Sequence, residues 1–208
     1  MVNKSLGSRL SIVISGWPAV GKTTMAIELA KKFSLKLYSG GDILKLLADA
    51  KGYSTSSHDW WDTHEAKRFM EERKSDPSFD NQVDKKLIQI IKNGNSVITS
   101  YTLPWLMKED RIIKFWLKAS QENRARRMAN RDNISYTKAK KVIQVRDSEN
   151  INIYKNLYGF NFGEDLKVFD FCLNTDVMSL DSLIEVSKSI ISCVGVTKIP
   201  EFRKGLSN

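Results

Sequence analysis

The chain alternates short apolar, β-branched stretches with longer amphipathic ones. The short stretches, which predict β-strands, are residues 10–15, 35–39, 96–100, 112–117 and 168–173. Apolar residues recur at helical spacing over residues 21–33, 42–50, 63–74, 81–92, 121–131, 136–158 and 180–194, and we expect at least one break within 136–158. Strands that alternate with helices favour an α/β fold, a five-stranded parallel sheet flanked by helices.

Two regions interrupt this alternation. Residues 40–95 place about three helices between the second and third strands, more than a single crossover requires. Residues 132–163 are dense in charged and amide side chains, so we expect an exposed, mobile segment. The tail, residues 195–208, is basic and is expected to be a flexible, solvated end.

Length and composition set broad limits. A chain of 208 residues suits one domain, and its net charge of +9 suits either a cleft that gathers phosphates or a weak nucleic-acid binder. No apolar run approaches the ~20 residues of a membrane helix, and residues 1–8 lack the apolar core of a secretion signal. We therefore expect a cytoplasmic protein without a membrane partner. Cys172 and Cys193 lie in apolar stretches and are expected to be free, buried thiols.

One motif directly follows the first predicted strand and opens the first predicted helix. It fits the phosphate-binding pattern G-x-x-x-x-G-K-[ST] and consists of Gly16, Trp17, Pro18, Ala19, Val20, Gly21, Lys22 and Thr23, followed by Thr24. We call residues 16–23 the phosphate loop. Its backbone amides would surround phosphate oxygens, Lys22 would neutralise the outer phosphates, and the Thr23 hydroxyl would bind Mg²⁺. The alternative is a glycine turn between a strand and a helix.

Arginines cluster on the predicted helix 121–131. Arg127 and Arg131 are four residues apart and therefore share a face, Arg124 lies on the same helix, and Arg146 follows the segment expected to be mobile. Guanidinium groups suit phosphate oxygens, so we predict that Arg127 and Arg131 act with Lys22 as catalytic cations. The alternative is a solvated helix face.

The order of several segments along the chain points to a family. These segments are the phosphate loop, Ser39-Gly40-Gly41-Asp42, Phe115-Trp116-Leu117-Lys118-Ala119, the arginine-bearing helix, Tyr154-Lys155-Asn156-Leu157-Tyr158-Gly159 and Asp170-Phe171-Cys172-Leu173-Asn174-Thr175. From about residue 10 to residue 194 the chain resembles the archaeal-type cytidylate kinases, which are nucleoside monophosphate kinases with a phosphate loop. The resemblance implies a P-loop kinase fold with strand order 2-3-1-4-5 and the cofactors ATP and Mg²⁺. It also implies a helical acceptor-binding insertion (residues 40–95) and an arginine-bearing lid (residues 132–150) within one domain, residues 1–208.

The resemblance also implies roles for single residues. On the ATP side, Arg127 would flank the adenine and Arg131 would reach the phosphates. Arg146 would return from the lid as a further catalytic cation, and Asn174 would line the adenine pocket. On the acceptor side, the implied substrate-binding residues are Ser39, Gly40, Asp42, Lys45, Asp80, Asp84 and Tyr101. A role as helix N-cap explains Asp80 equally well.

The chain departs from this family at several positions. Thr99-Ser100-Tyr101 stands where many relatives have an acid-glycine-arginine triplet, and Ile153 stands where a second arginine is usual. A lysine such as Lys45, Lys138 or Lys155 would supply charge but not the fork of an arginine. The longer insertion contains Trp60 and Trp61, whose rings would either stack on a base or form a local hydrophobic cluster. His58 and His64 have no metal-ligand spacing.

These observations predict an enzyme that transfers the γ-phosphoryl group of ATP to CMP or dCMP. Two alternatives remain open: an adenylate-kinase-like enzyme that uses another acceptor such as AMP or UMP, and an ATP-binding regulatory or RNA-associated protein without transfer activity. We expect small nucleotides as the ligands, no nucleic-acid partner and a monomer.

Overall fold

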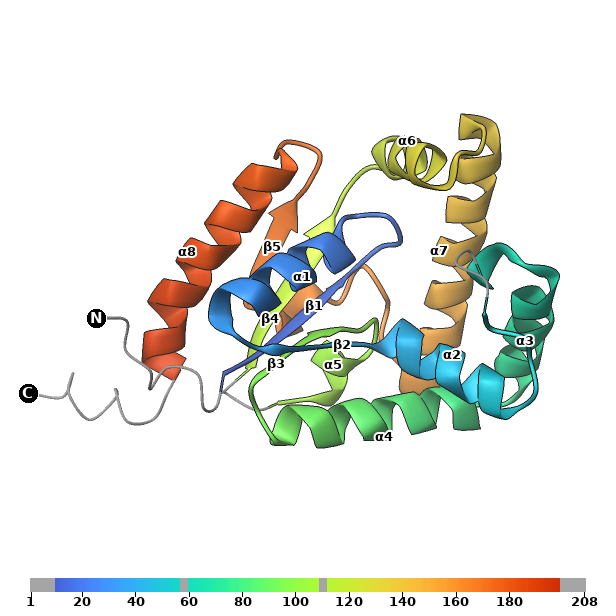
Figure 1. Ribbon diagram of the computed structural model, residues 1–208, viewed down its shortest axis with the longest axis horizontal. Coiled ribbons are helices and arrows are strands. Elements are labelled where there is room, and N and C mark those ends of the chain that lie inside the picture. The colour runs from blue at the N-terminus through green and yellow to red at the C-terminus, as the bar shows by residue number, and fades with distance from the viewer. Residues whose placement is uncertain (1–9, 57–59, 109–111, 199–208) are drawn as a thin grey trace, which may run out of the picture.

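A five-stranded parallel sheet forms the centre of the protein (Figure 1). The computed structural model describes residues 10–56, 60–108 and 112–198. Within them, the strands β1 (Ser11–Gly16), β2 (Lys36–Ser39), β3 (Ser96–Thr99), β4 (Ile112–Lys118) and β5 (Phe171–Asn174) lie in the order β2-β3-β1-β4-β5. The expected strand order is therefore confirmed. The fifth strand begins at Phe171 rather than at residue 168, because Leu166–Val168 form the short 3-10 helix η3.

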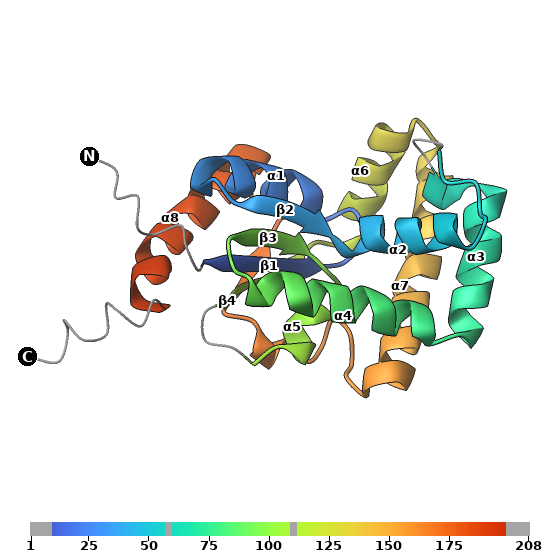
Figure 2. The same cartoon turned by 60° about the horizontal axis from the view of Figure 1, so that its bottom comes forward.

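Helices cover both faces of this sheet, as Figure 2 shows. One face packs against α1 (Lys22–Phe33) and α8 (Leu180–Lys198), and the other packs against α4 (Ser78–Lys92) and α5 (Leu103–Leu106). Side chains of a strand alternate between the two faces. In β1, Ile12 and Ile14 therefore belong to the core under α1 and α8, whereas Val13 belongs to the core under α4.

The remaining helices gather beyond one end of the sheet in both views (Figures 1 and 2). They are α2 (Gly40–Ala50), the short 3-10 helix η2 (Trp60–Asp62), α3 (His64–Ser75), α6 (Gln121–Asp132) and α7 (Tyr136–Tyr158). β1 leads into the phosphate loop at this end, so these helices surround the carboxyl ends of the strands. In parallel α/β sheets this is the edge where ligands bind.

The segment expected to be mobile and interrupted is a regular helix. Ser135 caps α7 by accepting a hydrogen bond from the Lys138 amide, and Gly159 ends it with a φ of 76°. No Gly or Pro lies between these two positions, and buried side chains recur along one face at Ala139, Ile143, Asp147, Asn150 and Tyr154. The prediction of a break was therefore wrong, because dense charge on the solvent face is compatible with a continuous helix.

Two other expectations need correction. Both thiols, Cys172 and Cys193, are exposed rather than buried. Cys172 lies on β5, the edge strand of the sheet, whose side chains are covered less completely than those of the central strands. α8 continues to Lys198, beyond residue 195 where the flexible tail was expected to begin, and residues 199–208 lie outside the described part. None of the described helices is long and apolar enough to cross a bilayer.

Candidate active site

A cavity of about 990 Å³ opens at the carboxyl end of the sheet. Its walls come from the phosphate loop, α2, α3, α4, the turn between β3 and α5, α6, α7 and the loop between β5 and α8. A volume of this size matches typical small-molecule sites. Residues 18–23 of the phosphate loop line the cavity together with segments far apart in the sequence.

Two glycines determine the course of the phosphate loop. Gly16 has a φ of +142°, and a Cβ built there would lie 2.2 Å from the carbonyl oxygen of Leu117. Gly21 is the N-cap residue of α1, with a φ of 99° and no side-chain cap. The first turn of α1 also contains no acidic residue, so its amides and the positive end of the helix dipole are left for an external anion. The loop geometry fits a phosphate group.

Lys22 extends along the inside of this loop. Its ammonium donates hydrogen bonds to the carbonyl oxygens of Gly16 at 2.8 Å and of Trp17 at 2.7 Å. Burial and the nearby Arg124 and Arg146 lower the pKa of Lys22 from 10.5 to about 7. An anionic ligand would favour the charged form, so this lysine suits a site that receives negative charge.

Not every residue of the motif contacts the cavity. Residues 18–24 line it, and the exposed Thr23 is among them. Gly16 and Trp17 do not line it, and the Trp17 ring packs edge-on against Phe162 at a centroid distance of 5.0 Å. Trp17 therefore anchors the loop to the core, and only its backbone carbonyl is directed to Lys22.

Two arginines of α6 and one of α7 reach the cavity, whereas Arg124 of α6 is buried. Arg127 and Arg131 line the cavity, as does Arg146 of α7. Arg127 donates to the side-chain oxygen of Thr175 at 2.8 Å and to its carbonyl oxygen at 2.5 Å, whereas the exposed Arg131 pairs with Asp132 at 2.6 Å.

Arg124 points away from the cavity and into the protein. Its guanidinium forms a bidentate pair with Asp147 at 2.8 and 2.6 Å and reaches the carbonyl oxygen of Pro18 at 3.5 Å. The side chain is almost fully buried. Arg124 therefore links α6 to α7 and to the phosphate loop.

On the acceptor side, only part of the predicted set reaches the cavity. Ser39 and Gly40 line it, and the Ser39 hydroxyl caps α2 by accepting from the Asp42 amide at 3.3 Å. Asp42 and Lys45 do not line the cavity: Asp42 is exposed in the first turn of α2, and Lys45 lies on a face of that helix outside the cavity wall. On the ATP side, Asn174 does not line the cavity. Its side-chain oxygen accepts from the Asp176 amide and closes a turn, and its neighbour Thr175 lines the cavity instead.

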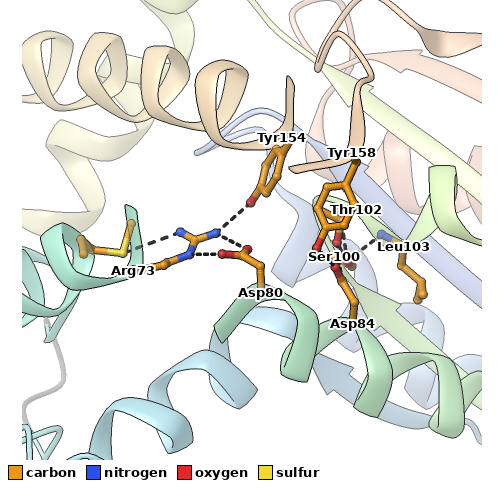
Figure 3. A network of polar contacts seen from close by, with 9 residues as sticks. Arg73, Asp80, Asp84, Ser100, Thr102, Leu103, Tyr154 and Tyr158 are labelled. Atoms are coloured by element: carbon orange, nitrogen blue, oxygen red, sulfur yellow. Dashed lines mark hydrogen bonds and ion pairs between the residues drawn. The ribbon is translucent and has the colours of Figure 1, made fainter. Parts of the chain in front are cut away.

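Asp80 and Asp84 lie in a buried polar network on α4 (Figure 3). Asp80 accepts from Arg73 Nε at 2.9 Å and from Arg73 Nη2 at 2.7 Å, and the same Nη2 lies 3.3 Å from the Tyr154 hydroxyl. The N-cap of α4 is Pro77, so the alternative role of Asp80 as the helix cap was wrong.

Asp84 lies one helical turn further along and is bonded on both carboxylate oxygens. It accepts from the Thr102 hydroxyl at 2.5 Å and from the Tyr158 hydroxyl (Figure 3). Burial raises the pKa of Asp84 above its usual value, and the two hydrogen bonds oppose that rise. Burial also raises the pKa of Tyr158. Arg73, Asp80, Asp84 and Tyr154 line the cavity, as does the predicted residue Tyr101.

Sequence reasoning missed Arg73, Thr102, Tyr154 and Tyr158 as site residues. The spacing of the two tyrosines on α7, four residues apart, was a usable signal, because it places both on one face. The sequence signal for Arg73 was weaker. Arg73 comes just before the turn that contains Pro77, and only the packing of α3 beside α4 brings its side chain to Asp80.

The family of the chain follows from its match to a family model. Residues 11–177 match the model of the cytidylate kinase-like family. The chain belongs to the cytidylate kinase-like family. It is an ATP-dependent nucleoside monophosphate kinase.

Curated relatives of this kinase match it over nearly their whole length. A cytidylate kinase from Pyrobaculum islandicum is 34% identical over 183 residues, which cover 88% of this chain and 93% of that protein. Cytidylate kinases from Ignicoccus hospitalis (31% identity, 86% of this chain and 98% of that protein) and Sulfurisphaera tokodaii (34%, 87% and 94%) match similarly.

Solved structures resemble the kinase in fold. Shikimate kinase from Acinetobacter baumannii superposes with a TM-score of 0.54 at 14% identity and covers 94% of this chain and 98% of its own. A gluconokinase from Sinorhizobium meliloti gives a TM-score of 0.53 at 11% identity and covers 97% of this chain and 99% of its own. These likenesses identify a P-loop kinase fold.

The tryptophans of the longer insertion in this kinase serve different purposes. Trp60 is fully buried and packs against Trp61 and Phe69 at centroid distances of 4.6 and 5.8 Å. It belongs to a hydrophobic cluster, one of the two alternatives. Trp61 also lines the cavity. His64 is exposed at the start of α3, and His58 lies outside the described residues.

Proposed function

We propose that this kinase transfers the γ-phosphoryl group of ATP to CMP or dCMP and so produces CDP or dCDP. One observation supports the proposal above all: a single cavity joins the phosphate loop and its cations to a pair of buried carboxylates beside Arg73. Lys22, Arg127 and Arg146 line the end at the phosphate loop, and Asp80 and Asp84 line the acceptor end. The first end suits a triphosphate and the second suits a neutral base with an amino group.

The phosphate loop and Lys22 would bind the outer phosphates of ATP. Mg²⁺ would be held by the Thr23 hydroxyl together with phosphate oxygens and water, since the described residues contain no cluster of three or more acidic, His or Cys side chains suited to a metal. The exposed position of Thr23 in the cavity wall fits this role. The ion would supply neutralisation of phosphate charge.

Arg127 would flank the adenine beside Thr175, and Arg131 and Arg146 would reach the phosphates. We further propose that residues 132–150 act as a lid and residues 40–95 as the acceptor-binding insertion, and that their closure excludes water. The attacking oxygen belongs to an acceptor phosphate that is already anionic near neutral pH, so no strong general base is needed. The protein contributes position and positive charge.

The test is ADP formation with CMP, dCMP, UMP, AMP and GMP as acceptors at fixed Mg·ATP. CMP and dCMP are expected to give the highest kcat/KM. Lys22→Met should abolish turnover, whereas the matched control Lys31→Met should retain it, because Lys31 is an exposed residue of α1 that pairs with Glu28. Highest activity with AMP or UMP would support the adenylate-kinase-like alternative. Saturable ATP binding without acceptor-dependent turnover would support a regulatory protein.

A further inference from the structure

Arg73 is a buried cation in the acceptor half of the cavity wall. It lies in the last turn of α3, and 6% of its side chain is exposed. Nε and Nη2 are bound by Asp80, and Nη2 also contacts the Tyr154 hydroxyl (Figure 3). Nη1 has only the sulfur of Met70, at 3.7 Å, among its described partners. Because thioether sulfur is a weak acceptor, Nη1 retains donor capacity for a stronger partner.

At two positions where the resemblance implies an arginine, Tyr101 and Ile153, this chain has no guanidinium. Tyr101 and Ile153 both pack against the aromatic cluster of Trp116, Tyr154, Phe160 and Phe162. Tyr101 lines the cavity, and its ring lies 6.1 Å from that of Tyr154, whose hydroxyl Arg73 contacts. Arg73 therefore delivers an arginine to the acceptor half from the opposite side, from α3.

The charges around Arg73 indicate which part of an acceptor it meets. Asp80 neutralises Arg73, and Asp84 adds a further carboxyl group nearby. A phosphate placed here would face two carboxylates, whereas Lys22 and Arg146 line the other end of the cavity. The end at Arg73 therefore suits an uncharged base that has both hydrogen-bond donors and acceptors.

The donor and acceptor groups at this end match one edge of a 4-aminopyrimidine. Cytosine presents an amino group beside a ring nitrogen and a carbonyl oxygen. The amino group requires a hydrogen-bond acceptor, and the ring nitrogen and the carbonyl oxygen each require a donor. Carboxylate oxygens and a guanidinium N–H provide this set. Uracil has an oxygen in place of the amino group, and this oxygen would face a carboxylate. The same site would therefore reject UMP.

The fold itself gives little reason to keep this pair. A buried ion pair is often no more stabilising than apolar side chains of the same volume. The pair is also placed in the wall of the cavity rather than in the interior of a helix bundle. A role in ligand recognition accounts for both facts.

We propose that Arg73, held by Asp80 and Tyr154, is a specificity-determining residue whose Nη1 donates to the ring nitrogen or carbonyl oxygen of the cytosine base, while Asp80 or Asp84 accepts from the amino group. The proposal rests on the proposed function and adds the residue that separates CMP from UMP. It makes no distinction between CMP and dCMP, because the contact is with the base.

The experiment compares Arg73→Gln and Arg73→Lys with the wild type, using CMP, dCMP and UMP at saturating Mg·ATP. Arg68→Gln is the matched control, because Arg68 lies on the same helix but is exposed and pairs with Glu65. Both Arg73 variants should lower kcat/KM for CMP and dCMP roughly tenfold or more and change UMP much less. The KM for ATP should not change. If Arg73→Gln does not fold, as judged by thermal unfolding, Arg73→Lys, which keeps the charge opposite Asp80, decides the outcome.

Each other result overturns the proposal. An equal loss with CMP and UMP would mean that Arg73 only positions α3 and α4. Unchanged kinetics would mean that it does not meet the acceptor. If the wild type turns over no nucleotide, the proposed function fails, and calorimetric binding of CMP and UMP then decides the Arg73 proposal separately: a CMP preference lost in the Arg73 variants supports it, and equal affinities contradict it.

Discussion

The ammonium of Lys22 lies 4.8 Å from the centroid of the Tyr101 ring. The same ring lies 6.1 Å from that of Tyr154, whose hydroxyl contacts Arg73. One aromatic side chain therefore connects the phosphate loop with the acceptor side of the cavity. It occupies a position where relatives were expected to carry an arginine, and its packing makes the orientation of Lys22 depend on an aromatic ring.

Removal of the Tyr101 ring should impair phosphoryl transfer more than removal of its hydroxyl. Tyr101→Leu is expected to lower kcat about tenfold, because a cation–π contact of about 1 kcal/mol and the packing behind Lys22 are lost. Tyr101→Phe keeps the ring and should retain most of the activity. Steady-state kinetics with CMP measure both. Equal losses in the two variants would show that the hydroxyl is the important group.

Binding of Mg·ATP should take up a proton above neutral pH. The pKa of Lys22 is about 7 in the free protein, so below pH 7 the lysine already carries its proton and at pH 8 it mostly does not. A bound triphosphate raises that pKa, and linkage then requires proton uptake and an affinity that falls as pH rises above 7. Calorimetry at pH 8 in buffers of different ionisation enthalpy measures the uptake. Lys22→Met should abolish it, and uptake that persists in the variant would assign it to another group.

Gly16 should tolerate no side chain. Gly16→Ala would place Cβ 2.2 Å from the carbonyl oxygen of Leu117, a backbone atom that cannot move without displacing β4. We expect a loss of unfolding free energy of about 3 kcal/mol or more. Gly52→Ala is the control, since Gly52 also has a positive φ, +89°, but its Cβ would meet nothing within 4 Å. That variant should lose only about 1 kcal/mol. Urea unfolding compares the two, and similar losses would exclude the steric explanation.

The buried pair of Arg124 and Asp147 should show strong coupling in a double-mutant cycle. Arg124→Ala leaves the buried Asp147 carboxylate without its cation, with the Gln121 amide at 3.2 Å as a hydrogen-bond partner, and should cost about 3 to 5 kcal/mol of stability. The double variant with Asp147→Ala should cost clearly less than the sum of the single changes. Arg126→Ala, the exposed neighbour that contacts Asn123, should change stability little. Additive losses in urea unfolding would contradict the coupling.

Arg127 should act on ATP and leave the acceptor unaffected. Its guanidinium is held by both oxygens of Thr175 at the edge of the cavity, distant in sequence from the acceptor-side residues. Arg127→Ala is expected to raise the KM for ATP about tenfold and to leave the KM for CMP nearly unchanged. Arg126→Ala again serves as the control. A rise in the KM for CMP of equal size would move Arg127 to the acceptor side.

Local patterns in the sequence were enough to predict the core of the fold and the phosphate loop. Strand–helix alternation and the spacing of Gly16, Gly21 and Lys22 are properties of short stretches of chain. The strand order, which the structure confirms, was implied by the resemblance in segment order instead. Errors occurred where local composition was ambiguous. The charged, amide-rich stretch around α7 is compatible with either a loop or an amphipathic helix, and buried contacts at positions such as Ile143 and Tyr154 favour the helix.

The sequence by itself determined the approximate extent of most strands and helices, the phosphate loop and the shared face of Arg127 and Arg131, because each depends on residues close together along the chain. Only the tertiary structure decided which charged side chains meet. It brought Arg73 of α3 to Asp80 and Tyr154, buried Arg124 against Asp147, and left Asp42 and Lys45 outside the cavity. The physical reason is that a guanidinium or carboxylate acquires its role from partners on other helices, and no periodicity within one helix records where those partners lie.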